Sequence, residues 1–77
     1  MVMGWQERIE VDAKVMGGKP VIEGTRVPVQ AIVAALAGGD DVARVCDQFQ
    51  VAEADVRAAL AYAAEVLDDE RVYALPA

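Results

Sequence analysis

The chain has 77 residues, a hydrophobic fraction of 56% and a formal net charge of −6. This length suffices for one domain, 1–77, and because a domain of this size buries only about 60% of its unfolded surface, we expect a homodimer. One cysteine and no histidine exclude an internal disulfide and a zinc cluster, and we expect no metal and no cofactor. No apolar run approaches the roughly 20 residues of a membrane span, and the start shows no secretion signal, so we expect a cytoplasmic protein.

Residues 8–27 have the pattern of a β-hairpin. The run RIEVD, 8–12, alternates polar and apolar residues, which predicts a half-buried strand with Ile9 and Val11 on one face. A second extended run begins at Val21, and Thr25 is expected to bond the backbone near the turn. The predicted turn residues are Gly17, Gly18, Gly24 and Thr25.

Residues 28–67 have the spacing of three helices, and helix-turn-helix order follows from their tight connections. Pro28 suits the first turn of the first helix. Gly38 and Gly39 are expected to end that helix. Asp40 is expected to cap the second helix, and Ala52 takes the capping position of a third helix over 53–67. The expected buried faces are Val29, Ile32, Val33 and Leu36; Val42, Val45, Cys46 and Phe49; and Val56, Ala59, Leu60, Ala63 and Leu67. The fold class is therefore mainly α, a three-helix bundle preceded by a short hairpin.

Ala52 is a poor capping residue because its side chain has no acceptor for the exposed N–H groups of the helix. We expect Ala52→Ser or Ala52→Asp to stabilise the chain by about 1 kcal/mol.

Residues 68–77 form an acidic and apolar tail after the third helix. Three acids at a helix end oppose the helix dipole, which predicts fraying there. Such a segment can order on a partner, although a solvated chain end has the same composition. The candidate partner-binding residues are Asp68, Asp69, Glu70, Val72, Tyr73 and Leu75.

The chain offers little to catalysis. It lacks serine, histidine and asparagine, so that Thr25, Cys46 and the tyrosines have no histidine base. The sequence also does not match the pattern of a phosphate-binding P-loop, because five residues separate Gly18 from Gly24 and no Gly-Lys-Ser/Thr leads into a helix. We predict no catalytic residues and no enzyme.

Charge is divided unequally along the sequence. Residues 1–39 carry four cations and four acids, whereas residues 40–77 carry three arginines and nine acids, which accounts for the net −6. Nucleic-acid binding usually leaves a basic footprint, so Lys19 and Arg26 are the candidate DNA contacts. Alternatively, they form ion pairs with Glu10, Asp12 or Glu23 across the hairpin.

The segment from Gly17 to Val29, GGKPVIEGTRVPV, closely resembles the domain-of-unknown-function 433 family. That family carries a G-G-K-P-V-I-x-G-T-R-[VI]-P-V pattern and a closing A-L-x-Y-A element, which Ala59, Leu60, Tyr62 and Ala63 match. The resemblance covers about residues 8–66. It departs where the third helix opens: family members often have a proline and a polar cap there, and a tyrosine-proline-type element before it, which the segment 48–55 lacks. Glu53 and Asp55 at this opening repel phosphates, which argues against base reading by the third helix.

The resemblance implies a homeodomain-like helix-turn-helix fold and an antitoxin of a type II toxin–antitoxin system. Its implied partner is a PIN-domain ribonuclease toxin, and operator DNA is a further implied partner through autoregulation. Two alternatives stay open from the sequence: a DNA-binding regulator without a toxin, and a module that binds only another protein.

Overall fold

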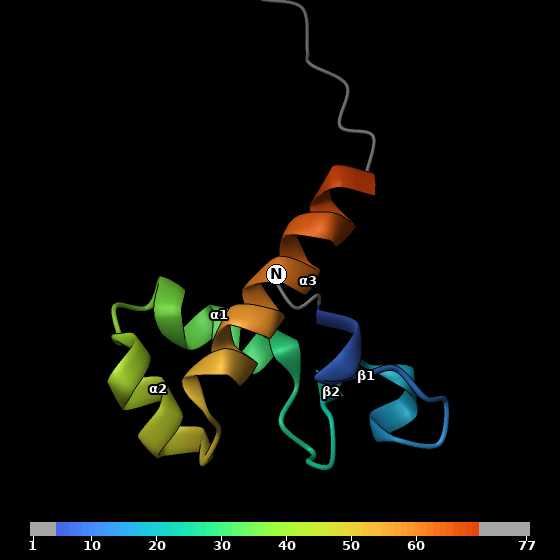
Figure 1. Ribbon diagram of the computed structural model, residues 1–77, viewed down its shortest axis with the longest axis horizontal. Helices are drawn as coiled ribbons and strands as arrows, with labels where there is room; N and C mark the ends of the chain where they lie inside the picture. The colour runs from blue at the N-terminus through green and yellow to red at the C-terminus, as the bar shows by residue number, and fades with distance from the viewer. Residues whose placement is uncertain (1–4, 70–77) are drawn as a thin grey trace, which may run out of the picture.

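The computed structural model describes residues 5–69. The chain folds into three α-helices preceded by a small antiparallel hairpin, as the sequence predicts (Figure 1). In chain order the elements are η1 (Trp5–Glu7), β1 (Ile9–Glu10), η2 (Met16–Gly18), β2 (Val21–Ile22), α1 (Val29–Ala37), α2 (Val42–Phe49) and α3 (Glu53–Asp69). Within these residues no helix has the length and apolar character needed to cross a bilayer.

The hairpin is shorter than the alternating pattern predicts. Ile9 pairs with Ile22 and Glu10 with Val21, and Ile9 is buried, but Val11 is 56% exposed. The expected burial of Val11 is wrong because the chain turns away immediately afterwards. The N–H of Lys14 donates to Oδ1 of Asp12 at 2.9 Å, and this turn removes the following residues from the strand.

The loop after β2 is held by its own backbone. Gly24 has φ of 77°, and the Ile22 N–H donates to the Val27 carbonyl at 2.9 Å. The Thr25 hydroxyl donates to the Ile22 carbonyl at 2.7 Å and accepts from the Val27 N–H at 3.0 Å. These hydrogen bonds fix the backbone of the turn and so place Pro28 at the start of α1.

α1 begins one residue later than predicted, because Pro28 occupies the N-cap and its carbonyl accepts from Ala31 and Ile32. Val29 and Ile32 are buried as expected. At the other end Gly39 adopts φ of 107°, which allows the sharp turn into α2.

Asp41, and not Asp40, caps α2. Its Oδ1 accepts from the Arg44 N–H at 2.8 Å, whereas Asp40 forms an ion pair with the Arg44 side chain at 3.3 Å. The expectation for Asp40 is wrong because α2 begins at Val42, which makes Asp41 the residue directly before the helix. Val45 is fully buried, but Val42 is 37% exposed, so its predicted burial is also wrong.

α3 packs against α1 and α2 and also against η1 and β1. Val56 and Ala59 are fully buried, and Ala58, which the predicted face omits, is buried as well. Leu60 and Leu67 are exposed, which contradicts the predicted face. The first turns of α3 contact α1 and α2 as well as η1 and β1, so the buried face there differs from the predicted one. The last turns of α3 extend past the other elements, which leaves Leu67 exposed (Figure 1).

One cluster of buried residues joins all three helices to the hairpin. Trp5 packs against it, and its ring meets that of Tyr62 edge-on with centroids 4.8 Å apart. The clustered residues are Ile9, Ile22, Val29, Ile32, Val45, Val56, Ala58 and Ala59. Trp5 therefore secures the N-terminal turn to α3.

Candidate protein-binding site

A groove of about 440 Å³ lies between the end of the hairpin, α1 and the second half of α3. The loops contribute Lys19, Pro20 and Pro28. The α1 wall contributes Val29, Gln30, Val33 and Ala34. The α3 wall contributes Tyr62, Ala63, Val66 and Leu67.

The chemistry of this groove suits apolar side chains of a peptide or protein. Lys19 is the one charged residue among the described lining residues, which include no carboxylate and no thiol. Sites for polar small molecules combine an apolar wall with a few convergent polar groups, whereas the polar side chains here, Lys19, Gln30 and Tyr62, come one from each wall of the groove. A helix placed in such a groove buries its apolar face, a common mode of peptide recognition.

The second half of α3 adds an exposed apolar surface next to the groove. Val66 is 39% exposed and Leu67 is 64% exposed, and both belong to the groove wall. Their apolar surface is contiguous with a hollow, unlike an isolated leucine on a protein surface. The arrangement therefore indicates a binding surface.

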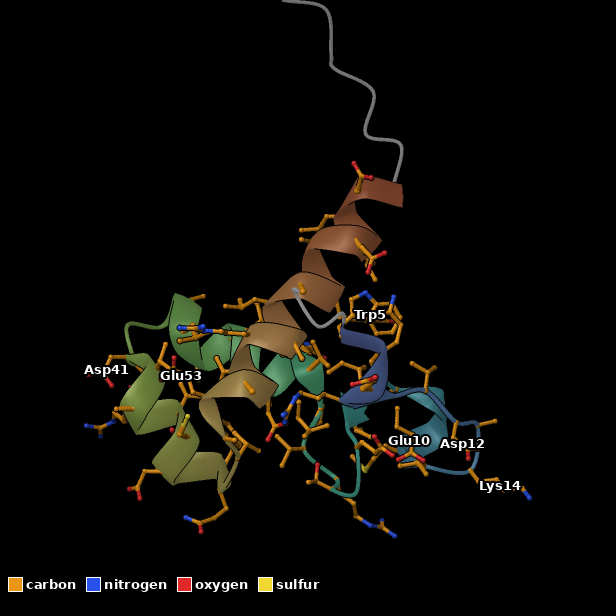
Figure 2. The ribbon with its side chains drawn as sticks, in the orientation of Figure 1. Trp5, Glu10, Asp12, Lys14, Asp41 and Glu53 are labelled. Atoms are coloured by element: carbon orange, nitrogen blue, oxygen red, sulfur yellow. The ribbon has the colours of Figure 1, made fainter. Side chains whose placement is uncertain are left out.

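The start of α3, which would read DNA in a helix-turn-helix protein, is acidic. Figure 2 shows Asp41 and Glu53 at the α2 side of the molecule, away from the loop that carries Lys14. The cations here are already paired, since Arg57 lies 2.7 Å from Glu53 and Arg44 lies 3.3 Å from Asp40. Such a surface repels phosphates.

Asp55 is committed to the fold. Its Oδ1 accepts from Nη1 of Arg8 at 2.9 Å, and its Oδ2 accepts from the Ala52 N–H at 2.9 Å. One carboxylate thus caps α3 and ties it to the residue before β1. The pair spans 47 residues, so no local pattern in the sequence indicates it.

The two candidate DNA-contact residues of the hairpin lie in different surroundings. Lys19 lies on the groove wall, whereas Arg26 lies in the loop before α1 and outside the groove. Among residues 5–69 neither forms an ion pair with Glu10, Asp12 or Glu23 within 4 Å. The sequence does not indicate the groove, because its walls come from residues 19–34 and 62–67, which are far apart along the chain.

The remaining candidates show no catalytic arrangement in the described part of the chain. The Thr25 hydroxyl is bonded to backbone groups on both sides, and the half-buried Cys46 packs against the core. No three His, Cys, Asp or Glu side chains between residues 5 and 69 are grouped so as to hold a metal. Gly17 and Gly18 have positive φ and shape the turn before β2.

The predicted partner-binding segment begins where α3 ends. Asp68 is exposed on the last turn, and α3 includes both Asp68 and Asp69. The other candidates, Glu70, Val72, Tyr73 and Leu75, lie outside the described residues.

Comparison with known proteins agrees with the hairpin and the helices. A family model described as "Protein of unknown function (DUF433)" matches residues 9–63. The chain belongs to the DUF433 family. An uncharacterized protein of Archaeoglobus fulgidus is 70% identical to this DUF433 chain over 27 residues, which are 35% of this chain and 75% of that protein.

A solved structure shares the fold. The crystal structure of Rv2018 from Mycobacterium tuberculosis superposes with a TM-score of 0.65 and 26% sequence identity. The match covers 73% of this DUF433 chain but only 27% of that chain, so the resemblance is to one part of a larger protein.

Proposed function

We propose that this DUF433 protein is an antitoxin of a type II toxin–antitoxin system that binds and neutralises a PIN-domain ribonuclease toxin. The feature that supports this most is the acidic and apolar stretch of sequence that follows the end of α3. The chain acts by binding and has no catalytic role. Membership of the DUF433 family is compatible with this role.

The toxin-contacting segment is Asp68, Asp69, Glu70, Val72, Tyr73 and Leu75. A nuclease that cleaves RNA has a cationic or metal-lined cleft, and carboxylates can occupy it in place of phosphates. Apolar residues next to these acids add buried area, which charge pairs alone do not supply. Asp68, on the last turn of α3, is exposed to solvent and so is accessible to a partner.

The acidic start of α3 favours a protein partner over DNA for the free chain. Arg44 and Arg57 are neutralised by Asp40 and Glu53, and Asp55 faces Arg8. Autoregulation of transcription would then need cations supplied by the bound toxin.

Co-expression with the PIN-domain protein encoded beside its gene tests the proposal. The tagged full chain should copurify that protein in a stable complex and suppress its ribonuclease activity. Tyr73→Asp with Leu75→Asp should abolish copurification, and Val11→Glu, on a distant loop, should leave it unchanged. Failure to recover a complex with any adjacent PIN-domain protein would contradict the proposal.

A mobility-shift assay on the chain's own promoter tests the part played by DNA. The free chain should not shift this fragment at physiological salt, whereas the complex with toxin should. A regulator without a toxin would behave differently: the free chain would shift the fragment, with affinity falling steeply as salt rises. A chain that binds toxin and never shifts DNA would be a protein-interaction module only.

A further inference from the structure

We propose that the groove between α1 and α3 is a self-docking surface, in which the second half of α3 of one copy lies in the groove of a second copy, and the reverse. This pairing does not depend on the proposed toxin. It assigns an occupant to the groove and leaves the segment after α3 available to another protein.

The first support is that the projecting residues and the hollow belong to the same surface. Val66 and Leu67 line the groove and keep 39% and 64% of their surface exposed, at the end of α3 that extends past the other elements (Figure 1). A two-fold interface requires one patch to be complementary to itself, with each copy supplying both the projection and the recess. A projecting apolar helix end beside an apolar groove meets this requirement.

The second support is the size of the facing side chains. Ala63, Val66 and Leu67 lie at i, i+3 and i+4 on α3, which places them on one face. Across the groove α1 presents Val33 and the exposed Ala34. Ala34 on one wall and Ala63 on the other are small, which allows a third helix to approach at the usual 8–10 Å between helix axes.

The third support is charge. Lys19 is the charged residue of the described groove wall, and it has no ion-pair partner within 4 Å among residues 5–69. The end of α3 carries Asp68 and Asp69, and the C-terminus of a helix has a partial negative charge of its own. An inserted α3 end therefore brings negative charge to a groove that holds a cation.

The extent of the surface sets the strength of the pairing. Stable complexes use about 20–30 residues on each side and bury about 800 Å² per partner. The groove supplies about half that number of residues, so the dimer should be weak and reversible, with a dissociation constant on the order of micromolar.

Sedimentation velocity on the purified full chain, from roughly 1 to 500 µM, tests the pairing. The unaltered chain should convert from monomer to dimer across this range. Leu67→Glu, on an exposed position, and Ala34→Arg, on the opposite wall, should each weaken association at least tenfold. Lys19→Glu should weaken it severalfold. Val11→Glu is the matched control, since Val11 is 56% exposed and outside the groove, and it should leave association unchanged.

Circular dichroism melting of each variant shows whether the fold is intact. A chain that stays monomeric throughout would overturn the proposal, and so would a dimer that persists in folded Leu67→Glu and Ala34→Arg chains. If the chain is monomeric and Leu67→Glu instead lowers affinity for the PIN-domain protein, the groove receives the toxin and the second-copy occupant is wrong. Because no toxin is present in the sedimentation experiment, its failure is separate from failure of the proposed function.

Discussion

The two halves of α3 have the same helical geometry and opposite surroundings. In the first half Val56 and Ala59 are fully buried, and Arg8 holds Asp55 in place. In the second half Val66 and Leu67 are exposed beside a groove. The first turns of this helix hold the fold together, and its last turns leave apolar surface exposed.

Two valines on the same helix provide the sharpest contrast. Val56→Ala removes buried methyl groups from the core and should lower the free energy of unfolding by about 2–3 kcal/mol. Val66→Ala should change it by less than about 0.5 kcal/mol, because Val66 is already 39% exposed and alanine favours helix. Urea denaturation of both variants measures the difference. Equal losses would contradict the division of α3.

Asp55 should show how firmly the first half is held. Asp55→Ala removes both the cap on Ala52 and the contact with Arg8, and should cost about 2 kcal/mol. Asp55→Asn keeps an acceptor for the cap and should cost about half as much. A double-mutant cycle with Arg8→Ala in urea isolates the ion pair. A coupling energy near zero would show that the cap alone matters.

Gly24 tests how much the positive φ of the turn after β2 contributes to stability. Gly24→Ala forces a Cβ into a backbone with φ of 77° and should cost about 1–2 kcal/mol, although the added atom meets nothing within 4 Å. Gly38→Ala is the control, since Gly38 has φ of −78° and should be close to neutral. Thermal melting distinguishes the two. An equal response would mean that the backbone of Gly24 is not constrained.

Ala52 should give the smallest effect. A serine hydroxyl at this position can accept from the Asp55 N–H while Asp55 continues to accept from the N–H of residue 52, so Ala52→Ser should stabilise by about 1 kcal/mol. Ala52→Asp should gain less because it places a second carboxylate near Asp55. An unchanged or lower melting temperature for Ala52→Ser would contradict the start of α3 at Glu53.

The sequence is sufficient for the order of the elements and for much of the core. Spacing of apolar residues predicts the burial of Ile32, Val45 and Val56, because those positions face the centre of the bundle whatever its details. It is insufficient for Leu60 and Leu67, since burial there depends on where neighbouring elements stop. Asp40 and Asp41 differ by one residue, which capping preferences alone do not resolve.

The candidate site is less accessible to sequence reasoning than the fold. The groove joins Lys19, Ala34 and Leu67, and only the packing of α1 against α3 brings these residues to one place. The Arg8–Asp55 contact likewise spans 47 residues. The acidity of the third helix is visible in the sequence, and so is the pairing of Glu53 with Arg57, because residues four apart on a helix are neighbours.

Amide NMR spectra recorded on serial dilution of the unaltered chain test most directly whether the second half of α3 binds while the first half only folds. Concentration-dependent shifts should be confined to the groove, at Val33, Ala34, Ala63 and Val66, and should vanish in the Leu67→Glu chain. Shifts centred on α2 and the first turn of α3, or no shifts up to millimolar concentration, would contradict this division.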